Sequence, residues 1–222
     1  MNRRMAAFCL VVSTVYLTSF IQLGVADEPK LVLGAKGPLL FEEKFDQESL
    51  AKGWNLNTGS LKVETGVLRA FEKSSDNHAG AFRYPLPLQD FAVQMDFKFD
   101  SGSKFLHLGF DPAPGQIKKK GHLFSVSVAP TGWSLIEHPN KDDPKSKNNV
   151  LASSKDSSEP GKWYTLLMEC KGDSVAAHIA GRESLRGTSS DFHVKKPGLV
   201  LRMGGPDDQA VSFDNFKVWE LK

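Results

Sequence analysis

The first candidates for chemistry in this sequence are a carboxylate and an imidazole, Asp96 and His107, on either side of the short turn segment 101–103. Each occupies a polar position in a stretch where apolar and polar residues alternate, which is typical of a strand with one buried face. We expect the turn to pair the two stretches as an antiparallel hairpin that brings Asp96 close to His107. A carboxylate that orients an imidazole forms a general base, so Asp96 and His107 are the predicted catalytic residues.

Four further residues are candidates for binding a ligand. Gln94 and Lys98 share the predicted polar face with Asp96, and Arg202 occupies a polar position in a later apolar run. Trp133 follows a Pro-Thr-Gly turn and is the tryptophan that we expect to stack on a ligand. The alternative is that the polar side chains cover a solvated sheet face and that Trp133 packs in the core.

The strands that must position these residues are predicted by short alternating runs separated by turn residues. The clearest run is 91–100, in which every second residue from Phe91 to Phe99 is apolar. Beyond residue 26 no long helical period interrupts this pattern. The sequence therefore predicts an all-β fold, a two-sheet antiparallel sandwich that forms a single domain over residues 27–222.

Residues 1–26 have the composition of a secretory signal peptide, with a basic start, an apolar centre and small residues before Asp27. We expect cleavage after Ala26 and export of the remaining chain to the periplasm or the cell exterior. The alternative is an uncleaved membrane anchor, because the apolar run approaches the roughly 20 residues that span a bilayer. Once the leader is removed, we expect no stable membrane span.

Charge and cysteine content exclude several functional classes. The formal net charge of +2 is spread along the chain, and 118–120 is its one short basic run, so nucleic acid is not an expected partner. Cys170 is the only cysteine beyond the leader, so no internal disulfide can form, and its apolar neighbours predict a buried, inert thiol. The polar segment 138–161 predicts a mobile surface loop.

The signatures of common hydrolases and metal sites are missing from the sequence. It contains no Gly-x-Ser-x-Gly elbow, no His-Glu-x-x-His, no paired cysteines and no phosphate-binding glycine loop. Asp207 and Asp208 offer carboxylates to calcium but lack a complete set of oxygen ligands, and we expect an acidic turn there. The sequence therefore assigns no metal and no cofactor, and it leaves the oligomeric state open.

Several motifs frame the predicted sandwich. They are LFEEKF at 40–45, GW at 53–54, LKVETGVL at 61–68, DFAVQMDF at 90–97, PGKWYTL at 160–166 and VSFDNFKVWEL at 211–221. In these motifs the chain resembles the concanavalin A/laminin-G-like jelly roll, and more closely the secreted bacterial 3-keto-disaccharide hydrolase domain. The resemblance covers essentially all of residues 27–222. It implies two curved sheets and a carbohydrate or glycoconjugate ligand.

Two functions from different classes remain open. Glucanases related to this fold carry two glutamates and an aspartate on one strand, whereas 93–98 offers Asp96 alone, so a glucanase of that kind is not expected. The first interpretation is a non-catalytic, lectin-like glycan-binding module, because no complete catalytic signature is present. The alternative is a hydrolase or lyase of 3-keto-glycosides, with Asp96 and His107 in a concave groove beside Gln94 and Arg202. A structural envelope protein is the third possibility.

Overall fold

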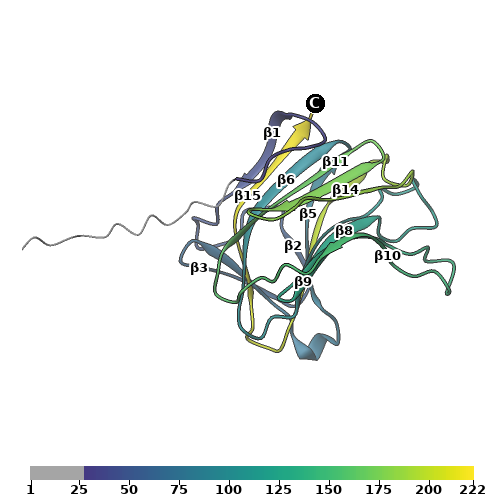
Figure 1. Ribbon diagram of the computed structural model, residues 1–222. Coiled ribbons are helices and arrows are strands. Elements are labelled where there is room, and N and C mark those ends of the chain that lie inside the picture. Colours follow the sequence, from purple (N-terminus) through teal and green to yellow (C-terminus); the bar gives the residue numbers. More distant parts are fainter. Residues whose placement is uncertain (1–27) are drawn as a thin grey trace, which may run out of the picture.

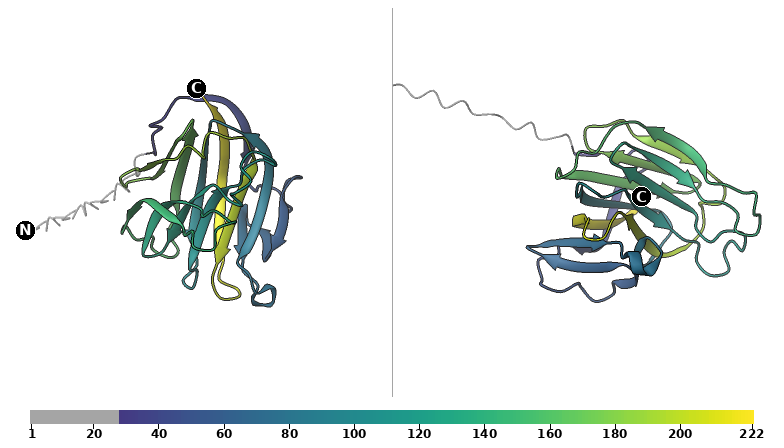
Figure 2. Two further views of the ribbon diagram at one scale, coloured as in Figure 1. Left: turned by 90° about the vertical axis from the view of Figure 1, so that its right-hand side faces the viewer. Right: turned by 90° about the horizontal axis from the view of Figure 1, so that it is seen from below.

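The computed structural model describes residues 28–222, and the predicted leader at 1–26 lies outside the described residues. Strands dominate because short alternating runs are separated by turns rich in glycine and polar residues. They form two antiparallel sheets packed face to face, as Figures 1 and 2 show. The predicted all-β, two-sheet antiparallel sandwich is confirmed.

Eight strands of the described chain form the first layer, called sheet A. In spatial order they are β13 (Leu185–Thr188), β12 (Ser174–Ile179), β11 (Tyr164–Lys171), β6 (Phe91–Phe99), β15 (Val211–Leu221), β4 (Val67–Phe71) and β3 (Ser60–Glu64), and β1 (Lys36–Glu43) also pairs with β15. Seven strands form the second layer, sheet B. Their order is β10 (Asn149–Ser154), β9 (Gly132–Glu137), β8 (Phe124–Ala129), β7 (Phe105–Phe110), β14 (Lys196–Gly204), β5 (Gly80–Leu88) and β2 (Asn55–Thr58). The short 3-10 helix η1 (Ser74–Asp76) lies between β4 and β5.

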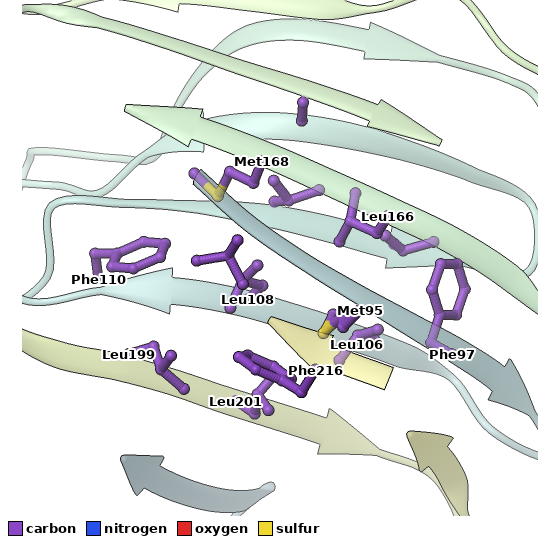
Figure 3. Close-up of a cluster of buried hydrophobic side chains, with 14 of the residues drawn as sticks. Met95, Phe97, Leu106, Leu108, Phe110, Leu166, Met168, Leu199, Leu201 and Phe216 are labelled. Carbon is purple, nitrogen blue, oxygen red and sulfur yellow. The ribbon is translucent and has the colours of Figure 1, made fainter. Parts of the chain in front are cut away.

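The core lies between the two sheets. Alternate residues of β6 are fully buried on its inner face, as the pattern in 91–100 predicts. Figure 3 shows Met95 of β6 in one cluster with Leu106 and Leu108 of β7, which belongs to the opposite sheet. Burial of each such side chain contributes roughly 1.5–3 kcal/mol. Cys170 is free and buried in the same cluster, so the prediction of a core without disulfides is confirmed.

The predicted hairpin between β6 and β7 is wrong. Strand β6 pairs with β11 and β15 in sheet A, whereas β7 pairs with β8 and β14 in sheet B. The turn at 101–103 therefore carries the chain from one sheet to the other. The reason is that alternation specifies which side of a strand is buried and does not specify its neighbour. Two consecutive strands can share a core by facing each other as well as by pairing edge to edge.

A short segment before β1 crosses the outer face of sheet A. Its backbone is held by Glu169 of β11, whose carboxylate accepts hydrogen bonds from the N–H groups of Val32 (2.9 Å) and Leu33 (2.8 Å). Glu169 is only 2% exposed, so these bonds satisfy a charge that the segment itself covers. We call residues 28–35 the N-terminal strap.

Two other predictions about the chain have clear outcomes. The segment 138–161 is not a loop throughout, because β10 lies within it and pairs with β9. The prediction that Cys170 is buried is confirmed, and burial raises the pKa of its thiol to about 11. No helix in the described residues is long and apolar enough to cross a membrane.

Candidate functional site

The outer face of sheet B carries a row of polar side chains across its central strands. Strand pairing places Arg202 of β14 beside His107 of β7, and His107 beside Ser127 of β8. Ser134 of β9 continues the row. These residues share one face because inner positions of the same strands, such as Leu201, fill the core. The pairing thus confirms that His107 and Arg202 lie together.

A carboxylate and a second imidazole complete this site just beyond the ends of β7 and β8. His122 Nδ1 lies 2.5 Å from Asp111 Oδ1, and Arg202 Nη2 lies 2.7 Å from His122 Nε2. Arg202 Nη2 also lies 3.2 Å from His122 Nδ1, so the guanidinium contacts the ring between its two nitrogens. An ionised carboxylate can only accept hydrogen bonds, so Nδ1 carries the proton that Asp111 accepts, and Nε2 of the neutral ring keeps its lone pair. The hydrogen bond between His122 and Asp111 is charge-assisted, and Arg202 contacts the same imidazole. We call Asp111, His122 and Arg202 the Asp–His–Arg chain.

The ionisation of the Asp–His–Arg chain follows from its surroundings. Burial raises the pKa of Asp111, but the hydrogen bond from His122 and the charges of Arg83 and Arg202 outweigh burial and hold this pKa below its ordinary value. Burial also lowers the pKa of Arg202, while the Asp111 carboxylate opposes that change. Asp111 is therefore ionised at neutral pH and can orient His122.

His107 stays uncharged at neutral pH. Burial lowers its pKa to about 4, and the charge of Arg202 acts in the same direction. A neutral imidazole beside a guanidinium can donate a hydrogen bond to a carbonyl oxygen without surrendering a proton. The pair of His107 and Arg202 is thus suited to hold an oxygen that gains negative charge.

A third histidine supports the site from behind. His138 Nε2 lies 2.8 Å from Ser125 Oγ, and the rings of His138 and His122 meet edge to face with centroids 5.4 Å apart. Burial lowers the pKa of His138 to about 4, with further contributions from His122, Arg202 and His107. The ammonium of Lys120 donates to the His138 carbonyl at 2.5 Å. His138 is therefore a neutral packing partner of His122.

The site is closely packed. A cavity of only about 10 Å³ lies among His107, Asp111, His122 and Arg202, which is room for about one water molecule. A sugar would therefore lie on top of these side chains and would not enter between them. No group of three or more acidic, histidine or cysteine side chains in the described residues is arranged to hold a metal ion.

Asp96 does not belong to this site. It lies on the outer face of sheet A, where it accepts hydrogen bonds from Thr165 Oγ1 (2.6 Å) and Asn215 Nδ2 (2.8 Å). His107 lies on the outer face of sheet B, so the predicted contact between Asp96 and His107 is wrong. The misplaced hairpin caused this error. Gln94 and Lys98 lie on the Asp96 side as well, so the predicted groove is split between opposite faces.

The prediction that Trp133 stacks on a ligand is also wrong. It is 3% exposed, and it packs in the core between the sheets. The alternation in β9 puts Trp133 and Leu135 inward, which leaves Ser134 on the outer face. The exposed tryptophan is Trp163, which is 39% exposed on the sheet A side with the Lys98 ammonium 4.8 Å from its ring centre.

The residues that sequence reasoning missed are Asp111, His122 and His138. Asp111 follows the end of β7 and His122 precedes β8, so neither occupies a position in an alternating run. In the structure Phe110 pairs with Phe124, and the residues just beyond this pair approach each other. Pairing 105–110 with 124–129, in place of 91–99 with 105–110, would have brought Asp111 and His122 together.

Comparison with known protein families shows to which family the chain belongs. The family of 3-keto-alpha-glucoside-1,2-lyase-like domains matches residues 40–218. The chain belongs to this family. The resemblance to the 3-keto-disaccharide hydrolase domain is therefore confirmed, and a carbohydrate-related role follows for this 3-keto-alpha-glucoside-1,2-lyase-like domain. No curated protein matches the sequence.

Solved structures similar to this 3-keto-alpha-glucoside-1,2-lyase-like domain include binding modules and enzymes. The carbohydrate-binding module CBM66 from Bacillus subtilis is 17% identical, with a TM-score of 0.58 over 76% of this chain and 96% of that one. The endo-beta-1,3(4)-glucanase SCLam of family GH16 is 14% identical, with a TM-score of 0.62 over 85% and 94%. A Bacillus subtilis protein with a galectin-like fold is 14% identical, with a TM-score of 0.65 over 85% and 98%. These identities show a shared jelly-roll fold only.

Proposed function

We propose that the protein is a lyase that cleaves 3-keto-α-glucosides by β-elimination at the outer face of sheet B. The observation that carries the proposal is the Asp–His–Arg chain, in which Asp111 orients His122 and Arg202 Nη2 lies 2.7 Å from Nε2 and 3.2 Å from Nδ1 of the imidazole. Removal of a proton next to a ketone requires a base for the proton and a cation that stabilises the enolate oxygen, and both must contact the same substrate. Membership of the family supports the choice of substrate.

The reaction needs no oxidant or reductant. His122 Nε2 takes the proton from C2 of the sugar, and the electron pair of that C–H bond forms an enolate whose oxygen at C3 is held by Arg202 and His107. The enolate then collapses, so that a C1=C2 double bond forms, the C3 carbonyl returns and the C1–O bond breaks. The leaving oxygen takes up the proton that His122 removed from C2, which gives an alcohol and an unsaturated ketone and restores the neutral imidazole.

Each protein group has one role in this scheme. Asp111 keeps the proton of His122 on Nδ1, so that the lone pair of Nε2 is available once the ketone oxygen has drawn Arg202 away. His107 remains a neutral donor because its pKa is about 4. His138 and Ser125 hold the ring of His122 in place. The predicted leader adds that the reaction takes place outside the cytoplasm.

The test uses purified residues 27–222 and a 3-keto-α-glucoside deuterated at C2. We expect release of the alcohol together with an unsaturated ketone, and a slower reaction for the deuterated substrate. Asp111→Asn and His122→Gln should each lower kcat by about 10²–10⁴-fold. Asp96→Ala serves as the matched control, because its carboxylate lies on the opposite sheet. Full activity of both site variants would refute the assignment.

Glycan binding without chemistry is the second candidate function. It is supported by an open groove of about 820 Å³ on the outer face of sheet A, which includes Gln94, the exposed Trp163 and Arg182 among its lining residues. Flat aromatic surfaces beside hydrogen-bonding side chains suit a pyranose ring. Saturable binding of a glycan that Trp163→Ala abolishes, together with no turnover of any 3-keto-glucoside, would favour this function over the lyase.

A further inference from the structure

An apolar pocket of about 160 Å³ adjoins the Asp–His–Arg chain on sheet B. Its apolar lining is formed by Pro85, Pro197, Gly198 and Val200, and Tyr84 and Leu199 lie beneath it with their side chains packed in the core. Asp111 and Val200 line both this pocket and the small polar cavity among the histidines. A ligand that reaches from one to the other therefore needs a polar part and an apolar part next to each other.

The pocket results from an irregularity in the pairing of β5 and β14. Their register shifts between Lys196 and Gly198, and Gly198 lies opposite Pro85. A side chain at position 198 would place its Cβ 2.1 Å from the Tyr84 carbonyl oxygen, so only glycine permits this close approach. β-Bulges of this kind recur beside active sites, where they reshape a strand.

The walls of the pocket are rigid before any ligand binds. The backbone beneath the pocket is held from the core side, because the Tyr84 ring stacks on Phe41 with centroids 4.0 Å apart and packs against Trp54 at 5.1 Å. Pro85 and Pro197 have fixed backbone angles. Binding of a ring in the pocket therefore costs little conformational entropy in the protein, and most of the free energy of burying the ring contributes to affinity.

The size and lining of the pocket select the kind of group that fits. A cavity of about 150 Å³ with apolar walls holds one benzene ring. A second sugar would bring several hydroxyl groups, whereas the polar lining residues are limited to Asn55, Arg83 and Asp111. Hydroxyl groups buried without hydrogen-bond partners are costly. An aromatic or other apolar ring is therefore the better occupant.

We infer that the preferred substrates are 3-keto-α-glucosides whose leaving group is an aromatic or other apolar ring, and that this ring occupies the pocket beside Asp111. The inference rests on the proposed lyase function for its chemistry. It goes beyond that function because it specifies the aglycone. The pocket lies next to the residues that act on C1 and C2, which is where the leaving group must be.

The test compares phenyl, methyl and glucosyl 3-keto-α-glucosides as substrates of residues 27–222. We expect kcat/KM for the phenyl substrate to exceed that for the methyl substrate by about 10- to 100-fold, from the apolar area that a buried ring removes from water. Asn55→Trp places a large side chain at the exposed rim of the pocket and should bring the phenyl-to-methyl ratio close to one. Leu56→Trp is the matched control, because the neighbouring position is exposed and does not line the pocket.

Binding of unoxidised glucosides separates this inference from the lyase proposal. Calorimetry with phenyl and methyl α-glucoside should show about tenfold or greater preference for phenyl, lost in Asn55→Trp. Turnover with equal kcat/KM for phenyl and methyl substrates would overturn the pocket assignment and leave the lyase standing. A preference for the disaccharide would overturn it as well. Phenyl-selective binding without turnover would support the pocket assignment and refute the lyase function. Absence of both phenyl preference and turnover would refute the pocket assignment and the lyase function.

Discussion

Acid should destabilise this protein through two buried histidines well before its carboxylates are protonated. His107 and His138 each have a pKa of about 4, against an ordinary value of 6.5. Between these two pH values the unfolded chain binds a proton at each site and the native protein does not. Stability therefore falls as the pH drops through 6.5, the loss is complete below about 4, and above 6.5 there is no loss.

The expected magnitude follows from the two pKa values. One pH unit of difference corresponds to about 1.36 kcal/mol, so each histidine lowers the free energy of unfolding by about 2 kcal/mol at pH 5 relative to pH 7.5. His107 and His138 together lower it by about 4 kcal/mol. Domains have a total stability of about 5–15 kcal/mol, so this loss is easily measured.

The assay is urea unfolding followed by tryptophan fluorescence at pH 7.5 and pH 5. The double variant His107→Gln, His138→Gln should lose about 4 kcal/mol less than the wild type between the two pH values, and each single variant about 2 kcal/mol less. Glutamine at 138 can still bond Ser125 Oγ, so the comparison isolates protonation. Equal pH dependence in the wild type and the double variant would refute the neutral state of these histidines, on which the role of His107 depends.

Three other substitutions have defined outcomes. Trp133→Ala should lower the free energy of unfolding by about 3–5 kcal/mol in urea titrations because Trp133 fills the core, and an equally stable variant would contradict that position. Asp96→Ala should cost about 1–3 kcal/mol through its two lost hydrogen bonds, while unchanged stability would show that these bonds contribute nothing. Glu169→Ala should cost a similar amount and expose the N-terminal strap to limited proteolysis, and a strap that stays protected would show that Glu169 does not anchor it.

The sequence was most informative about the faces of the strands. Alternation along β6 identifies its buried side residue by residue, because each inward position must be apolar to fill the core. The same rule predicts the outward positions of His107 and Arg202, and both lie on one face of sheet B. Local turns were also predictable, since β8 pairs with β9 on either side of 130–132.

The neighbours of each strand and the residues of the site were harder to predict from the sequence. Whether β7 pairs with β6 or with β8 depends on how the whole chain folds back, and alternation is the same in both arrangements. Asp111 and His122 lie beyond the strand ends, where no periodicity constrains them. Their importance depends on a contact across the strand pair, which a single sequence pattern does not contain.

The N-terminal strap also determines how the protein faces its surroundings. Glu28 lies beside the groove on sheet A, and the strap is fastened to that sheet through Glu169. A bead or label attached at Glu28 itself would therefore stand beside the sheet A groove, on the opposite side of the sandwich from His107, and would leave the pocket of sheet B open to a bulky glycoside.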